Sequence, residues 1–246
     1  MPKKTATKKK ATRKTKSGTA KKRPRAPATK PPARFRGMDV TTRAVAMFDT
    51  LTREYPDAHC MLDFTNAFEL LIATILAAQC TDVMVNRVTP DLFRRYPRAP
   101  AFLKATDEKI QEMIFKTGFY RQKTKSIKKC CRALVDEHDG EVPSAMEDLV
   151  ALAGVGRKTA NCVRGNVFNL PGIVVDTHVK RLAYRMGFTV ETNPDKIERD
   201  LNAIVPEKEW THVSHLLADH GRAVCDARRP LCETCPVEHL CPKYLD

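Results

Sequence analysis

The 246-residue chain is long enough for one sizeable or two modest domains, and its 42% hydrophobic residues can build a core. No apolar run approaches the roughly 20 residues of a membrane span, and the N-terminus lacks the apolar stretch of a secretion signal, so we expect an intracellular protein. The net charge of +14 comes from one segment, because residues 1–36 hold 15 Lys and Arg and no acid, whereas the remainder holds 28 Lys and Arg against 29 Asp and Glu.

The basic segment at the N-terminus has the composition of a tail outside the folded part of the chain. Residues 1–37 are mostly Lys, Arg, Ala, Thr and Pro, with Phe35 as the single aromatic, so we predict that they are disordered. Such a tail binds nucleic acid through counterion release, without sequence preference. The alternative is a targeting or solubility segment. If the protein is bacterial, we expect it in the cytoplasm in association with the nucleoid, and the basic tail leaves nuclear import open.

Apolar spacing predicts helices after the tail. Asn66 and Glu69 match a capping pair, and the helix that they begin is apolar on most faces, as in a buried central helix. A polar break, Gln79 to Asp82, follows it. The predicted helix over residues 120–137 has a basic face, which is most simply a face exposed to solvent (Arg121, Lys123, Lys125, Lys128 and Lys129). The predicted helices of this part span residues 41–55, 68–78, 83–92, 107–116 and 120–137.

A helical hairpin is predicted next. Ser144 and Glu147 match a capping box that starts a short helix with Leu149, Val150 and Leu152 as its apolar face. The turn Gly154-Val155-Gly156 leads into a second helix over residues 157–168. Both glycines permit conformations that a side chain would resist, and they leave the backbone open to close approach. Free amides and the positive end of a helix dipole then favour a phosphate at the turn.

Lys158 lies in the first turn of that second helix. The dipole disfavours an ammonium there and so favours the neutral amine, which is a nucleophile. A non-catalytic contact to a phosphate is an equally simple interpretation. The G-x-x-x-x-G-K-[ST] spacing of a nucleotide-binding loop is absent, which argues against nucleotide binding.

Asp176 follows Lys158 by 18 residues and stands where an N-cap is expected for a helix over 179–186. A helix of about a dozen residues spans roughly 18 Å, and the segment after it can return Asp176 toward the glycine turn. Helices over 194–205 and 210–220 follow. On the last of them, His212 and His215 share a face, which could ligate a metal, but we interpret them as a packed or surface pair because no third ligand is in reach.

Four of the nine cysteines cluster at the end of the chain: Cys225, Cys232, Cys235 and Cys241. Cysteines without an export signal argue against a disulfide framework, although a disulfide pairing remains the alternative. Four thiolates can hold a zinc ion or a 4Fe-4S cluster, and the single Cys-x-x-Cys favours iron and sulfur over a two-knuckle zinc ribbon. Four other cysteines are most simply small buried or half-buried side chains (Cys60, Cys130, Cys131 and Cys162).

Three motifs together resemble the endonuclease III family of the helix-hairpin-helix DNA glycosylase superfamily. They are Leu-Ala-Gly-Val-Gly-Arg-Lys-Thr-Ala at 152–160, Val-Asp-Thr-His at 175–178, and C-x6-C-x2-C-x5-C ending at Cys241. The resemblance covers residues 40–246. It implies an all-α protein with a six-helix domain at 60–170 and a second helical domain, at 38–59 and 171–246, that holds a 4Fe-4S cluster. Double-stranded DNA would lie in the cleft between them.

The resemblance also implies an activity and a set of residue roles. The family removes oxidised pyrimidines from duplex DNA and then cuts the strand at the abasic site; we expect a monomer. Lys158 resembles the nucleophile that forms a Schiff base before β-elimination, and Asp176 its carboxylate partner. Gln79 resembles the residue that fills the gap left by the flipped nucleotide, and Phe119 an apolar wedge beside it. The phosphate-binding hairpin would be Gly154, Val155, Gly156 and Arg157, and the cluster ligands Cys225, Cys232, Cys235 and Cys241.

The chain departs from the family pattern at three positions. Ala153 replaces a proline, Ala77 a serine, and Cys80 an alanine or threonine, and these changes bear on the preference for the base opposite the lesion. Two alternatives remain. Adenine-mismatch glycosylases share the hairpin, the aspartate and the cluster but lack a lysine at the position of Lys158 and carry an extra C-terminal domain. A non-catalytic helix-hairpin-helix module would only grip the DNA backbone.

Overall fold

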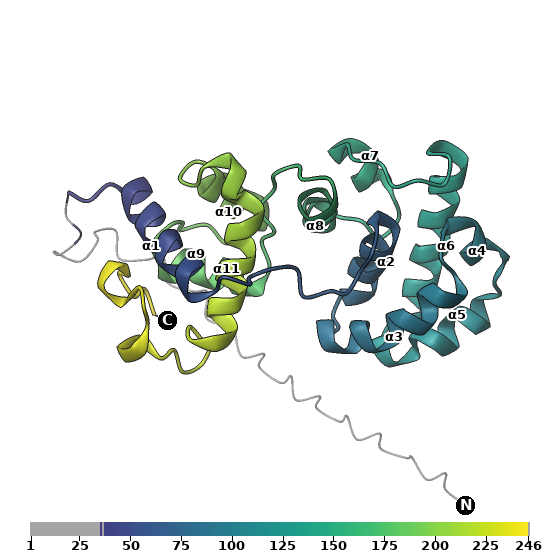
Figure 1. The fold of residues 1–246 in the computed structure, drawn as a ribbon, viewed down its shortest axis with the longest axis horizontal. Coiled ribbons are helices and arrows are strands. Elements are labelled where there is room, and N and C mark those ends of the chain that lie inside the picture. The colour runs from purple at the N-terminus through teal and green to yellow at the C-terminus, as the bar shows by residue number, and fades with distance from the viewer. Residues whose placement is uncertain (1–34, 36, 246) are drawn as a thin grey trace, which may run out of the picture.

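The computed structural model describes residue 35 and residues 37–245, and within them the fold is all-helical (Figure 1). The first seven helices are α1 (Val40–Glu54), α2 (Ala67–Ala77), α3 (Asp82–Arg95), α4 (Ala99–Lys104), α5 (Asp107–Ile114), α6 (Tyr120–Glu137) and α7 (Met146–Ala151). The next four are α8 (Arg157–Val167), α9 (Thr177–Arg185), α10 (Pro194–Asn202) and α11 (Trp210–Ala223). Four short 3-10 helices complete the described elements: η2 (Phe115–Thr117), η3 (Glu207–Glu209), η4 (Cys232–Thr234) and η5 (Glu238–Leu240). The predicted all-α fold is confirmed, and in the described part of the chain no helix is long and apolar enough to cross a bilayer.

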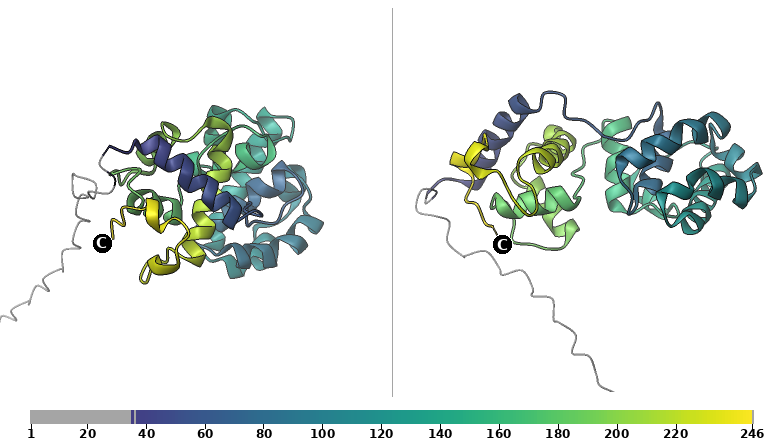
Figure 2. Two further views of the ribbon diagram at one scale, coloured as in Figure 1. Left: turned by 60° about the vertical axis from the view of Figure 1, so that its left-hand side comes forward. Right: turned by 90° about the horizontal axis from the view of Figure 1, so that it is seen from below.

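The helices pack around two hydrophobic cores. The first core is built by residues between 62 and 163, and the second by residues 44–51 together with residues between 173 and 237. Figure 1 shows α2 to α6 on one side, α1 and α9 to α11 on the other, and α8 between them; Figure 2 shows the same two groups from two further directions. The fold therefore offers a place between two cores where residues far apart in the chain can meet.

The central helix of the first core is α2. Leu70, Leu71 and Ile72 are fully buried, and the helix begins as predicted, with the Asn66 side chain accepting a hydrogen bond from the Glu69 backbone N–H (3.0 Å). Thr81 caps α3 in the same way. Burying so apolar a helix on most faces removes a large apolar area from water, which is the main favourable term in folding.

The prediction for the start of α7 was wrong. The helix begins at Met146, its N-cap is Ala145, and no side chain caps it. Ser144 instead offers its backbone carbonyl to the Arg164 Nε–H of the facing helix α8 (3.1 Å). A tertiary hydrogen bond therefore replaces the local one that the sequence suggested.

Helix α4 was not predicted at all. It has six residues, which is too short for an apolar period to stand out, and Arg98 at its N-cap makes no side-chain capping bond. Phe102 holds it in place, because this fully buried ring contacts the rings of Tyr96 (5.1 Å) and Phe68 (5.8 Å). Packing rather than local propensity therefore makes this helix.

The predicted disordered tail, residues 1–37, lies mostly outside the described residues, but its end does not. Phe35 is 5% exposed, and the Arg43 guanidinium lies 5.7 Å from its ring centroid. The Arg43 side chain in turn donates to the Gly187 carbonyl (3.1 Å). Within the described residues, Phe35 is therefore a buried ring beside α1 and not a solvated side chain, as composition had indicated.

Candidate active site

One pocket between the two cores brings Lys158 and Asp176 together. Helix α8 supplies Lys158 from its first turn, and Asp176 is the N-cap of α9. The wall is completed by the segment before α2, by the turn after α2 that carries Gln79, and by α11. Its other lining residues are His59, Cys60, Met61, Leu62, Thr74, Ala77, Ala78, Asp82, Thr159, Cys162, Val174, Ser214, His215, Ala218 and Arg222.

The chain after α8 is held so that Asp176 faces this pocket. Asn161 on α8 donates from Nδ2 to the Ile173 carbonyl (3.0 Å), and Ser214 on α11 accepts the Val174 backbone N–H (2.8 Å). Gly172 permits this approach, since a Cβ there would meet the Asn161 side chain at 2.7 Å. The segment is therefore pinned between two helices just before it reaches Asp176.

Asp176 itself is half-buried, and one of its oxygens is already used. Its Oδ1 accepts the Val179 backbone N–H at 2.8 Å, which is the predicted N-cap of α9. The cap does not use the second oxygen. Lys158, by contrast, is exposed, so its amine is accessible to a ligand in the pocket. An exposed amine and a fixed carboxylate on one pocket can act as a nucleophile and a base.

The two hairpin glycines have different reasons to be glycine. Gly154 has φ +85°, and a Cβ there would lie 3.0 Å from Ser126 Cβ. Gly156 has φ −101°, and a Cβ there would meet nothing within 4 Å. The prediction that both need a conformation closed to other residues is therefore wrong for Gly156, which only leaves the backbone bare.

The hairpin amides also differ in their availability. Val155 is 6% exposed, and its backbone N–H donates to the Leu152 carbonyl (3.1 Å), so it serves the fold of the turn. Helix α8 begins without a side-chain cap at Gly156. Its first-turn N–H groups therefore lack a capping acceptor, and the positive dipole end there favours a phosphate.

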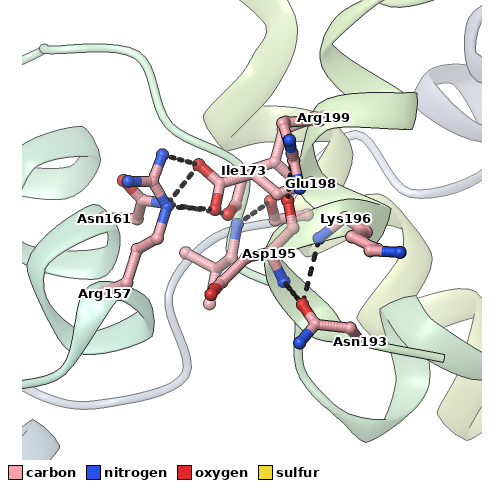
Figure 3. A network of polar contacts seen from close by, with 10 residues as sticks. Arg157, Asn161, Ile173, Asn193, Asp195, Lys196, Glu198 and Arg199 are labelled. Atoms are coloured by element: carbon pink, nitrogen blue, oxygen red, sulfur yellow. Dashed lines mark hydrogen bonds and ion pairs between the residues drawn. The ribbon is translucent and has the colours of Figure 1, made fainter. Parts of the chain in front are cut away.

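Arg157, which the sequence places among the DNA-contacting residues, also has a partner within the fold (Figure 3). Its Nε and NH2 groups donate to the two carboxylate oxygens of Glu198 on α10, at 2.7 and 2.8 Å. Asn161 donates to the same carboxylate (3.0 Å). Sequence reasoning missed this because the partner lies 41 residues further along the chain.

Gln79 and Phe119 share an unusual backbone. Both are exposed and both have left-handed φ angles, +54° and +47°. Gln79 lines the pocket; Phe119 stands at the start of α6 with 64% of its surface exposed. Left-handed backbone is costly for residues other than glycine and often marks functional positions.

Sequence reasoning missed several residues of the pocket wall. Arg222 on α11 pairs with Asp82 on α3 across it (3.3 Å). Cys162 lies four residues after Lys158, so the helical period alone could have placed it on the same face. A hydrogen bond joins its thiol to that of Cys60, which lowers the pKa of Cys60 and, with burial, raises that of Cys162.

His215 is a packed residue, which is one of the two interpretations drawn from the sequence, and it also lines the pocket. Its Nε2 lies 3.0 Å from the Asn166 Oδ1 on α8. Burial lowers its pKa to about 4, so the ring is neutral at physiological pH. It therefore joins α11 to α8 without adding charge to the pocket.

A second pocket gathers the four clustered cysteines: Cys225, Cys232, Cys235 and Cys241. Among the described residues, no group of three or more His, Cys, Asp or Glu side chains is close enough to hold a single metal ion. The four thiols instead line the wall of one pocket. Arg185 donates to the Cys225 sulfur (3.5 Å). The His220 Nε2 lies 3.4 Å from the Cys235 sulfur. The buried Arg185 Nε–H has no acceptor among the described residues, so this pocket offers a cationic donor as well as four thiols. These groups fit an anionic iron–sulfur cluster.

Two family models match the chain in the regions just described. Residues 72–207 match the HhH-GPD superfamily base excision DNA repair proteins. Residues 225–241, from the first to the last clustered cysteine, match the iron-sulfur binding domain of endonuclease III. The chain is 51% identical to endonuclease III of Synechocystis sp. over 201 residues, which cover 81% of this chain and 92% of the relative.

The chain belongs to the endonuclease III family. Endonuclease III of Escherichia coli K12 is 41% identical over 191 residues, covering 78% of this chain and 90% of the relative. Among solved structures, a trapped endonuclease III–DNA covalent intermediate superposes with a TM-score of 0.79 at 41% identity, covering 83% of this chain and 96% of that one. A thermostable thymine-DNA glycosylase shares the fold, with a TM-score of 0.74 at 24% identity.

Membership of the endonuclease III family confirms three predictions from the sequence. The fold is that of a helix-hairpin-helix glycosylase, the enzyme class is DNA glycosylase with abasic-site lyase activity, and the cofactor is a 4Fe-4S cluster. DNA is the macromolecular partner of this family.

Proposed function

We propose that this chain, acting as a monomer, removes oxidised pyrimidines from duplex DNA and cleaves the strand at the abasic site, with Lys158 as nucleophile. The observation that carries the proposal is that Lys158 and Asp176 line one pocket, each fixed at the N-terminus of its own helix. The pocket is open to a nucleotide that has been flipped out of the duplex.

In the first step the Lys158 Nζ attacks the sugar C1′ of the flipped nucleotide. The bond from C1′ to the damaged base breaks, and the base leaves with the electron pair. Asp176 stabilises the positive charge that develops on the sugar and accepts the proton that the attacking amine releases. Because the cap on α9 fixes this carboxylate in place, little reorganisation is needed when the charge develops.

In the second step the bond from C1′ to the ring oxygen O4′ breaks, O4′ takes up the proton that Asp176 received, and the Lys158 nitrogen forms a protonated Schiff base with C1′. A proton then leaves C2′, and the bond from C3′ to its phosphate oxygen breaks, which cuts the strand. The uncapped first turn of α8 holds a phosphate of the lesion strand close to these atoms. Gln79 fills the gap in the duplex, and Phe119 wedges beside it.

The iron–sulfur cluster has a structural part in this proposal. When bound, it supplies iron–thiolate bonds that fold the C-terminal loop against the second core. The residues that would hold it are the four clustered cysteines, supported by Arg185 and His220. All bond changes above take place in the other pocket.

Borohydride trapping tests the proposal. A duplex that carries one oxidised pyrimidine should yield a covalent protein–DNA complex with the wild-type protein, and Lys158→Gln should abolish it. Lys129→Gln is the matched control, because Lys129 is an exposed lysine on α6 outside the pocket. Undamaged DNA and DNA with an oxidised purine should give no complex. No trapping by the wild-type protein, or unchanged trapping by Lys158→Gln, would overturn the proposal.

A further inference from the structure

A buried lysine joins the two turns that carry Gln79 and Phe119. The sequence places Lys123 on a solvated face of α6, but the residue is only 5% exposed. Its Nζ donates to the Leu76 carbonyl and to the Thr117 carbonyl, both at 2.7 Å. Neither acceptor belongs to α6, so this ammonium links α6 to two other parts of the first core.

Each acceptor lies next to one of the left-handed residues. Leu76 is in the last turn of α2, three residues before Gln79, and Thr117 ends η2, two residues before Phe119. Because the Lys123 Nζ binds both carbonyl oxygens, the two oxygens lie no farther apart than twice the 2.7 Å hydrogen-bond distance. The Lys123 backbone N–H also donates to the Phe119 carbonyl (3.0 Å). Lys123 therefore contacts the Phe119 turn twice and the Gln79 turn once.

Charge makes this arrangement unusual. In the part of the chain that the structure describes, no carboxylate pairs with the ammonium, and burial lowers the pKa of Lys123 although the nearby Cys80 thiol opposes this shift. Its charge is balanced by two carbonyls at the C-terminal ends of α2 and η2, where helix dipoles are negative. A buried charge held only by carbonyls is costly in comparison with an apolar side chain of the same length. What the ammonium provides in return is a fixed geometry between the two turns.

We propose that Lys123 is a positioning residue that fixes the separation of Gln79 and Phe119 for insertion into the DNA duplex. The inference rests on the proposed function, in which these two residues enter the space left by the flipped nucleotide. Left-handed backbone persists only where its surroundings hold it, and the hydrogen bonds from Lys123 are such a constraint on both turns. A displaced turn would misplace its side chain relative to the base stack.

The test compares duplex with single-stranded DNA, because a single strand has no base stack to enter. Lys123→Met should lower the rate of borohydride trapping on a duplex abasic site by at least about tenfold, as misplaced positioning groups do. The same variant should trap a single-stranded abasic site at close to the wild-type rate. Lys129→Met, on the exposed face of α6, is the matched control and should leave both rates unchanged.

A double-mutant cycle shows whether Lys123 acts through Gln79. If it does, Lys123→Met combined with Gln79→Ala should slow duplex trapping no more than the larger of the two single changes. Should Lys123→Met not fold, Lys123→Arg replaces it. The longer, planar guanidinium must spread the two carbonyls, and the same loss confined to duplex DNA is expected.

The outcomes separate this inference from the proposed function. The role of Lys123 would be overturned by equal losses of trapping rate on duplex and single-stranded DNA, by fully additive losses in the double-mutant cycle, or by no loss on the duplex. In each of these cases trapping by the wild-type protein would still support Lys158 as the nucleophile. Absence of trapping by the wild-type protein on both DNAs would overturn the proposed function, and this inference with it.

Discussion

At the scale of single residues, Asp176 combines a structural and a chemical role. Its Oδ1 caps α9, and the same carboxylate faces the pocket that holds Lys158. Asn is as good an N-cap as Asp, so Asp176→Asn should leave the melting temperature almost unchanged. Base release should fall by about 100-fold or more, because the amide can neither accept the proton nor balance the sugar cation.

Single-turnover excision assays and thermal melts check this prediction together. Binding to abasic DNA should persist in Asp176→Asn, since no DNA-contacting group is removed. Asp176→Ala is the control for the cap and should lose about 1 kcal/mol of stability as well. Wild-type base release by Asp176→Asn would remove the carboxylate from the chemistry.

The two hairpin glycines give a second prediction at this scale. Gly154→Ala should lower the free energy of unfolding by about 1–2 kcal/mol for the left-handed backbone, with a further cost from the contact with Ser126. Gly156→Ala should cost less, up to about 1 kcal/mol, because alanine is a poorer N-cap of α8 than glycine, but it should weaken DNA binding, because the added methyl stands where the phosphate approaches. Denaturant titration and DNA affinity separate the two effects. Equal destabilisation by both variants would contradict the different roles.

At the scale of elements, the contact between Arg157 and Glu198 fastens α8, which carries Lys158, to α10 (Figure 3). The two partners differ in burial: the Arg157 side chain is 49% exposed and that of Glu198 6%. Arg157→Met should therefore cost about 3–5 kcal/mol of stability, because it leaves a buried carboxylate without its cation. Glu198→Gln should cost less, about 1.5–3 kcal/mol, since the exposed Arg157 can be hydrated. Urea unfolding checks the order, and a larger loss from Glu198→Gln would contradict it.

The contact between α11 and α8 depends on pH through His215. Burial lowers its pKa from 6.5 to about 4, so between these values the unfolded chain binds a proton that the folded chain does not. Stability is then complete above pH 6.5 and falls as the pH falls toward 4, by about 3 kcal/mol in total from this ring. His215→Gln should flatten that part of the acid-unfolding curve. Parallel curves for the variant and the wild-type protein would show that the ring does not contribute.

At the scale of the whole molecule, the charge is divided between two parts of the chain. Residues 1–36 carry 15 Lys and Arg without an acid, whereas the rest is close to neutral. Deleting residues 1–34 should therefore lower the slope of log affinity for DNA against log salt, by about 0.9 for each phosphate that the tail neutralises. Replacing the Lys and Arg of that segment by Gln is the control and should lower it equally. An unchanged slope after the deletion would mean that the segment does not contact DNA.

The sequence could predict those features whose cause is local. The turn at Gly154, the N-caps at Asn66 and Asp176, and the helical periods depend on residues within a few positions of one another. Cysteine spacing indicated the iron–sulfur loop for the same reason, since all four thiols lie within one short segment.

Only the tertiary structure decided which polar residues are used by the fold itself. Arg157 and Lys123 both look like free cations in sequence, yet one is bound by Glu198, 41 residues away, and the other by the carbonyl of Leu76, 47 residues away. Phe35 looks like part of a disordered tail in the sequence, yet its ring is buried beside Arg43 of α1. Composition and hydrophobic periodicity cannot predict the burial of these side chains, because it depends on which distant segment packs over each charge or ring.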